Sequence, residues 1–245
     1  MHSIYKYIPH YDGLFFENFL LRATPRNELN DPFEFVPPRE FYEMAINCTK
    51  PGEDLEWIKR ISYDQFSKRF YPFEGVICFT ETRSNLLMWS HYAQKHTGLV
   101  IEFDSSNDFF KDLKHVRYDN IKPNNITNLN ELFFIKSDEW IYEKEHRIVK
   151  RLSEHNFYIK KSEMTIHIAK NSATHYPDNT EEMYMFLVPK VSIKSVTFGC
   201  NINASLKEKI INKIRSDKEI QNVVLWQTNL SKDYFYLEFE EMKNI

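Results

Sequence analysis

Glycine is scarce in this sequence. The chain has five glycines in 245 residues, against a usual share of roughly 7%, and they form neither G-x-G-x-x-G nor G-x-x-x-x-G-K-[ST]. Those motifs cradle phosphate groups because their backbone N–H groups approach the ligand closely. The sequence therefore excludes phosphate-binding loops of the Rossmann and Walker types.

Cysteine is also rare, and no metal motif is present. Cys48, Cys78 and Cys200 are widely spaced without a C-x-x-C pair, which favours reduced thiols over a disulfide framework or a zinc knot. His91 and His96 are five residues apart, whereas paired zinc ligands on a helix need a spacing of four. We expect no metal.

Long apolar runs and strong net charge are absent as well. No segment approaches 18 uncharged apolar residues, and the first residues show no apolar targeting region. The formal charge is −3, from 32 basic and 35 acidic residues. We predict a cytoplasmic protein that does not bind membranes and has no strong bulk attraction for nucleic acid.

Aromatic residues, in contrast, are abundant. Twenty Phe, fourteen Tyr and four Trp exclude a disordered chain. A chain of this length buries about 70% of the surface that its unfolded form exposes. We predict a single domain spanning residues 1–245.

The spacing of apolar residues changes often along the chain, which predicts a series of short strands and helices. Apolar alternation and buried runs predict strands at 4–8, 21–24, 75–80, 99–103, 115–118, 140–150, 165–169, 183–188, 191–198, 223–227 and 234–239. Helical patterns cover 14–20 after a cap at Asp12, 39–47, a segment from Pro51, 84–95 with a cap at Ser84 and a stop at Gly98, 105–113, 127–135 and 205–214. Because these elements do not succeed one another as βαβ units, we predict an α+β fold, with a mixed or split β-sheet and short helices.

Two carboxylates and a guanidinium share one face of the expected strand at 140–150. Side chains two positions apart point the same way in a strand, so Glu143, Glu145 and Arg147 form one row. If the row faces inward, it lines a polar cleft, because buried carboxylates need partners or water. If it faces outward, it is a solvated row of weak ion pairs. Both interpretations stay open.

The expected helix at 84–95 carries an aromatic edge. Trp89, Tyr92 and His96 lie at i, i+3 and i+7, and His91 lies on the neighbouring edge. Such rings can stack on a planar ligand, or they can belong to the hydrophobic core. On the first strand, Lys6 faces away from Tyr5 and Tyr7, the two tyrosines that flank it.

Several spaced motifs carry a family resemblance. In chain order they are Tyr5-Lys6-Tyr7, residues 30–34 (Asn-Asp-Pro-Phe-Glu), Cys78-Phe79-Thr80, Met88-Trp89 through Gly98 with Glu102-Phe103, Trp140-x-Tyr-Glu-x-Glu-x-Arg147 and Phe198-Gly199. Over nearly its whole length the sequence resembles the bacterial domain of unknown function 2971. That family name implies no activity.

A second resemblance implies chemistry. The Tyr-rich first strand, the strand Leu-Leu-Arg-Ala-Thr, and a later Glu-bearing strand followed by Phe186-Leu-Val-Pro and Val191-Ser-Ile-Lys-Ser-Val are similar to ADP-ribosyltransferase-like domains. Those domains hold NAD between two small sheets, and a late-strand Glu stabilises the cation formed as nicotinamide leaves.

The resemblance implies a set of site residues and partners. It assigns catalysis to Glu143 or Glu145, NAD binding to Lys6 or Tyr7, and coverage of the nicotinamide ring to Trp89 or Tyr92. It implies an NAD-dependent ADP-ribosyltransferase or NAD glycohydrolase, with an unknown macromolecular acceptor and a role in toxicity or phage defence. NAD would be a substrate.

Other functions are compatible with the same residues. A non-catalytic sensor would keep the cleft and bind a nucleotide or a protein through Arg147, Trp89 and Tyr7. His91 is a further candidate for ligand binding. A nucleophilic Cys78 is disfavoured because Val76-Ile-Cys-Phe79 reads as an apolar strand with a buried, inert thiol. The acid-x-Lys spacing of Asp112 and Lys114, which some nucleases use, falls at the end of an expected helix.

Overall fold

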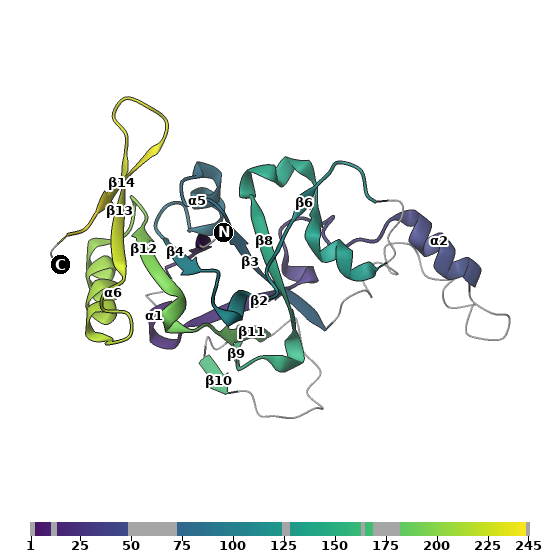
Figure 1. Cartoon of the computed structure of the whole chain (residues 1–245), viewed down its shortest axis with the longest axis horizontal. Helices are drawn as coiled ribbons and strands as arrows, with labels where there is room; N and C mark the ends of the chain where they lie inside the picture. Colours follow the sequence, from purple (N-terminus) through teal and green to yellow (C-terminus); the bar gives the residue numbers. More distant parts are fainter. Residues whose placement is uncertain are drawn as a thin grey trace.

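The computed structural model confirms the α+β class. It describes residues 3–10, 14–48, 73–123, 128–162, 165–168 and 182–243. Figure 1 shows a large twisted sheet with short helices around it, and helix α2 (Arg39–Cys48) standing out at one end. No helix of the described ranges has the length and apolar character to cross a membrane.

Twelve of the described strands form one sheet. The main path has the order β10-β9-β11-β2-β3-β1-β4-β12-β13-β14. Off this path, β8 pairs with β3, and β5 pairs with β8. The strands are β1 (Ser3–Ile8), β2 (Leu20–Pro25), β3 (Glu74–Thr80), β4 (Leu99–Asp104), β5 (Lys114–His115), β8 (Glu145–Arg151), β9 (Phe157–Lys160), β10 (Thr165–Ile168), β11 (Glu182–Leu187), β12 (Ile193–Phe198), β13 (Val224–Leu230) and β14 (Leu237–Glu241). Only β12 and β13 are parallel among the pairs in this sheet.

The sheet divides at β3. Strand β8 pairs with one edge of β3 along its full length. The other edge is shared, because β2 pairs only near Val76 and β1 pairs only at Thr80. Between these points β1 and β2 separate, and the Lys6 ammonium donates a 2.7 Å hydrogen bond to the Cys78 carbonyl there. The split of the sheet thus leaves an opening over the middle of β3.

An aromatic and aliphatic core fills one face of the sheet. Its buried residues come from β1, β3, β4 and β12, from helix α1 (Phe15–Asn18) and from helix α6 (Ala204–Ser216). Ile210, Ile211 and Ile214 of α6 are buried, as their spacing on one helical face predicts. Helices α1 and α6 contact each other beside β12 (Figure 1).

Helix α5 (Leu86–Tyr92) begins and ends differently from the prediction. Its N-cap is Asn85, whose side chain accepts a hydrogen bond from the Met88 N–H, and not Ser84. The helix stops at Tyr92 because the residues from Gln94 to His96 have positive φ angles. Gly98 is needed for another reason: a Cβ atom there would lie 2.4 Å from the Ile8 carbonyl oxygen.

The prediction of one strand over 140–150 was wrong in its first half. Residues Asp138–Glu143 form a 3-10 helix (η5), and Lys144 has a φ of 44° that turns the chain into β8. The expected helices at 105–113 and 127–135 are the shorter 3-10 helices η3 (Asp108–Phe110) and η4 (Leu129–Phe134). The expected cap at Asp12 and the helix from Pro51 lie outside the described residues.

Most of the other expected elements in the described residues are present with shifted ends. The expected strand 115–118 is divided into β5 and β6 (Arg117–Tyr118), and β6 pairs with β7 (Ile135–Lys136). Three further short elements connect the strands, namely η2 (Arg26–Glu28), η6 (Leu152–Glu154) and η7 (Lys190–Ser192). The turn chemistry at residues 30–34 is confirmed, because the Phe33 N–H donates to Asp31 Oδ1.

Candidate functional site

A cleft opens where β1 and β2 separate over β3. Its cavity has a volume of about 240 Å³. The lining residues are Tyr5, Lys6, Tyr7, Arg22, Thr24, Glu28, Leu29, Asn30, Glu34, Cys78, Phe79, Thr80, Met88, Tyr92, Lys136, Glu143 and Glu145. The wall is therefore mixed, with aromatic rings, four carboxylates and three cations.

A buried ammonium lies at the centre of the acidic wall. Lys136 Nζ is 2.7 Å from Glu143, 3.1 Å from Glu34 and 3.4 Å from Glu145. All four side chains are at most about one-twentieth exposed. Charges buried to this degree persist only when they are paired, and one lysine serves three carboxylates here.

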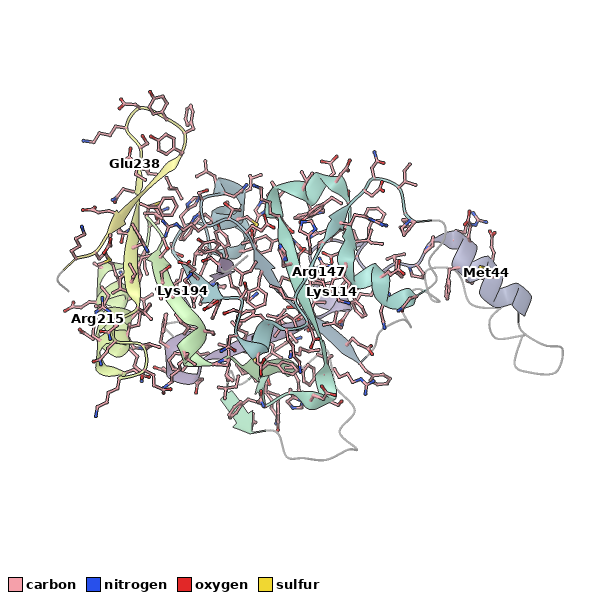
Figure 2. The ribbon with its side chains drawn as sticks, in the orientation of Figure 1. Met44, Lys114, Arg147, Lys194, Arg215 and Glu238 are labelled. Atoms are coloured by element: carbon pink, nitrogen blue, oxygen red, sulfur yellow. The ribbon has the colours of Figure 1, made fainter. Side chains whose placement is uncertain are left out.

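Arg147 completes the cluster from beneath. It is fully buried, and Figure 2 shows it near the middle of the molecule on β8. Its Nε and Nη2 atoms each donate a 2.8 Å hydrogen bond to Glu145, and Nη2 also pairs with Glu34. Nη1 donates to the Phe133 carbonyl. This two-point contact fixes both oxygens of Glu145.

Local backbone geometry brings these side chains together. The turn made by Asp31 and the positive φ of Phe35 (57°) direct Glu34 inward. Lys144 has a left-handed conformation between Glu143 and Glu145, and both carboxylates reach Lys136. The sequence thus uses two tight bends to converge three acids on one ammonium.

The environment separates the pKa values of the three acids. Burial raises the pKa of Glu143 and of Glu34, and the neighbouring cations only partly offset this effect. Burial also acts on Glu145, but the charges of Arg147 and Lys136 outweigh it and lower the pKa to about 2. The cluster thus lowers the pKa of Glu145 and raises those of Glu143 and Glu34.

The cluster has one more carboxylate than it has paired cations. Three carboxylates face Lys136 and Arg147, and the Lys6 ammonium is engaged by the Cys78 carbonyl. Burial lowers the pKa of Lys6. The cluster therefore holds an excess negative charge or takes up a proton.

Most of the residues predicted from the sequence lie at the cleft. Glu143, Glu145, Lys6, Tyr7 and Tyr92 line the cleft. The Tyr92 hydroxyl donates to Glu143 Oε1 at 2.5 Å and accepts a hydrogen bond from Asn30. Arg147 does not line the cleft, but it pairs with Glu145 and Glu34 of the acidic wall.

Trp89 does not lie in the cleft. Its indole is fully buried, packs edge-on against Tyr7 at 5.4 Å, and donates a hydrogen bond to the Arg83 carbonyl. A planar ligand has no access to this ring, so the core alternative describes Trp89. Tyr92 is the aromatic residue of α5 that a ligand can reach.

A second cavity continues the cleft. It has a volume of about 350 Å³ and is lined by Ile8, Pro9, Leu14, Phe15, Asn18, Leu20, Leu21, His91, Ile159 and Met185 besides the shared residues. Lys6, Tyr7, Arg22, Thr24 and Tyr92 line both cavities. The two cavities are therefore neighbours, the first lined by acidic side chains and the second mainly by apolar ones, and we refer to them together as the groove. His91 is exposed and lines the second cavity.

Glu34, Lys136 and Asn30 are functional candidates that sequence reasoning did not assign to the site. Glu34 and Asn30 belong to the motif at residues 30–34, which carried the family resemblance but was interpreted as a bend. Lys136 directly follows the apolar run Leu132–Ile135. A lysine at the end of such a run was the available signal for a buried cation.

Comparison with known proteins finds one family. Residues 88–148 match the model of a family described as a protein of unknown function, DUF2971. The matched stretch runs from α5 into β8 and includes Tyr92, Lys136, Glu143, Glu145 and Arg147. Neither curated proteins nor solved structures gave a match, so no comparison connects this chain with ADP-ribosyltransferases.

Proposed function

We propose that this protein binds NAD in the groove and cleaves the bond between nicotinamide and ribose. The observation that carries the proposal is the buried Glu143 carboxylate on the wall of a cleft formed by a split sheet. The ADP-ribosyl group passes to water or to a macromolecular acceptor. The resemblance to ADP-ribosyltransferase-like domains described from the sequence supports the reaction class, and the position of Glu143 on the cleft wall supports its role.

The chemistry requires a negative charge beside a developing cation. As the bond between ribose C1′ and the nicotinamide nitrogen breaks, its electron pair neutralises the pyridinium ring and the ribose becomes an oxocarbenium-like cation. Attack by water at C1′, with loss of one proton, gives ADP-ribose. A carboxylate held in a partly dry cleft stabilises this cation more than solvent does.

Glu143 suits this role better than Glu145. Both oxygens of Glu145 are bound by the guanidinium of the fully buried Arg147, and Lys136 contacts it as well, so Glu145 carries more ion pairing than Glu143 and positions the cluster. Glu143 receives one hydrogen bond from Tyr92 and one from Lys136, which orient its carboxylate at the cavity wall. We assign Glu143 to catalysis, and Tyr92 and Lys136 to its positioning.

The groove also suits the remainder of NAD. Lys6 and Arg22 line both cavities, and cations complement a diphosphate. To bind one, they would exchange their present partners, the Cys78 carbonyl and Glu28, for phosphate oxygens. The apolar cavity beyond them has room for an adenine ring against aliphatic and aromatic side chains. The acidic cavity then receives the nicotinamide ribose.

One observation favours a second function, that of a non-catalytic nucleotide sensor. Lys136 contacts all three carboxylates, and this pairing reduces the charge available to a transition state. A sensor binds NAD or a related nucleotide in the same groove without breaking a bond.

Nicotinamide release separates the two functions. Purified protein is incubated with NAD labelled in the nicotinamide ring, and free nicotinamide is counted. The enzyme proposal predicts release by the wild type, loss of at least about a hundredfold in Glu143→Gln, and unchanged release in Glu139→Gln. Glu139 lies on the same 3-10 helix but is exposed. NAD binding without release supports the sensor, and absence of NAD binding contradicts both the enzyme and a sensor of NAD.

A further inference from the structure

Two histidines and a glutamate meet on the opposite side of β8 from the ion-pair cluster. Glu81, His115 and His146 each place one ligand atom within 4.8 Å of the others. His146 Nε2 is 2.8 Å from Glu81 Oε1, and the two imidazole rings have centroids 5.0 Å apart. These side chains come from three different parts of the sheet.

Strand register explains the meeting. His115 of β5 lies directly opposite His146 of β8, and opposite residues of antiparallel strands have neighbouring side chains. Glu81 directly follows β3, where its N–H donates to the Lys144 carbonyl. Because side chains alternate along a strand, His146 points away from the face that carries Glu145 and Arg147. The triad is therefore built by paired backbones and does not depend on the cleft.

We propose that Glu81, His115 and His146 bind a divalent transition-metal ion, with Zn²⁺ as the best fit. Imidazole nitrogen and carboxylate oxygen are ligands that Zn²⁺ takes at about 2.0–2.2 Å, and two histidines with one carboxylate form a three-ligand zinc set. Neighbouring ligand atoms of such an ion are roughly 3.3 Å apart. Small side-chain rotations bring atoms that already lie within 4.8 Å to this spacing.

The site is open on one side. Glu81 and His115 are exposed, and His146 is half-buried, so a fourth position faces solvent and takes water. When the metal binds, it replaces the hydrogen bond between His146 Nε2 and Glu81. The ion then links β5 and β8 to the segment that directly follows β3, and β8 carries Glu145 of the acidic wall. The inference departs from the sequence expectation of no metal, and it is independent of the proposed NAD chemistry.

The test is a titration of the metal-free full chain with Zn²⁺, followed by calorimetry. The wild type is expected to bind one equivalent. His115→Ala and His146→Asn are expected to lose more than the roughly 10- to 100-fold in affinity that outer-shell changes cost. His91→Ala is the matched control, since His91 is an exposed histidine outside the triad, and it should bind as the wild type does. Equal binding by all four proteins overturns the proposal.

A second measurement needs no variant. X-ray absorption of the zinc-loaded wild type is expected to show two imidazole nitrogens with oxygen ligands. Coordination by sulfur, by one imidazole or by oxygen alone overturns the assignment, as does failure of the wild type to retain zinc.

Circular dichroism of each variant in the titration shows whether a loss of affinity comes from a loss of fold.

Discussion

The Tyr92 hydroxyl lies 2.5 Å from Glu143 Oε1 and donates a hydrogen bond to it. This contact joins the end of helix α5 to the end of the 3-10 helix η5 at the wall of the cleft. The second Glu143 oxygen receives the Lys136 ammonium. The carboxylate proposed to act on NAD is thus held at both oxygens by groups from two other elements.

The first prediction concerns Tyr92→Phe. The change keeps the ring and removes the donor, leaving Glu143 with one partner fewer. We expect a loss of about 1–3 kcal/mol in the free energy of unfolding, as for hydrogen bonds to charged groups, and slower nicotinamide release. Urea unfolding and the release assay measure the two effects.

Tyr142→Phe is the matched control for this change. The Tyr142 hydroxyl lies 3.4 Å from His91 Nδ1 in an exposed contact, so its removal should cost within about 0.5 kcal/mol. Equal effects of the two substitutions would show that the Tyr92 hydroxyl does not support Glu143.

The second prediction concerns Arg147→Met. Removing the guanidinium leaves Glu145 and Glu34 buried beside a single lysine. We expect a loss of about 3–5 kcal/mol in the free energy of unfolding, the usual cost of breaking a buried pair. Adding Glu145→Gln to the variant should restore part of this loss. Chemical denaturation measures both.

Arg151→Met on the same strand provides the comparison, because Arg151 is exposed. It should change stability by less than about 0.5 kcal/mol. An equally small loss of stability in Arg147→Met, or a further loss on adding Glu145→Gln, would show that this ion pair does not stabilise the cluster.

The third prediction concerns pH. Burial raises the pKa of Glu143 above its ordinary value of 4.5, so above pH 4.5 the folded chain holds a proton that the unfolded chain has lost. Stability due to this group is therefore full below 4.5 and falls as pH rises through the raised pKa. Glu143→Gln has no ionisable group at this position, so the variant does not lose this stability as pH rises.

We accordingly expect the variant to gain stability relative to the wild type as pH increases from 4.5 toward neutrality. Urea titrations at several pH values measure the difference, with Glu139→Gln following the wild type. If the wild type instead becomes more stable relative to Glu143→Gln as pH rises, the ion pair with Lys136 lowers the pKa of Glu143.

The grouping of the two glutamates with the arginine could be predicted from the sequence, although the secondary structure predicted for part of this segment was wrong. We expected Glu143, Glu145 and Arg147 on one strand face, and the structure instead bends the chain at Lys144. The side chains still converge, because each buried charge needs a partner. Alternation along β8 alone brings Glu145 and Arg147 together. The left-handed residue gave no sequence signal, since lysine rarely adopts this conformation.

The partners contributed from distant segments were not predictable. Glu34 and Lys136 meet across a separation of about a hundred residues, and strand pairing over such distances has no local signature. Trp89 was also ambiguous, since a helical aromatic edge fits both a ligand face and a core. Its packing against Tyr7 depends on how α5 lies on β1. Most strands were found because their apolar patterns are local.

The most direct test of the account is a crystal structure of Glu143→Gln with NAD bound. The substitution keeps the shape of the side chain and removes the charge, so the dinucleotide should remain uncleaved. We predict the nicotinamide ribose against residue 143 and Tyr92, the diphosphate near Lys6 and Arg22, and adenine in the apolar cavity. NAD bound elsewhere, or a groove that stays empty at saturating NAD, would contradict the account.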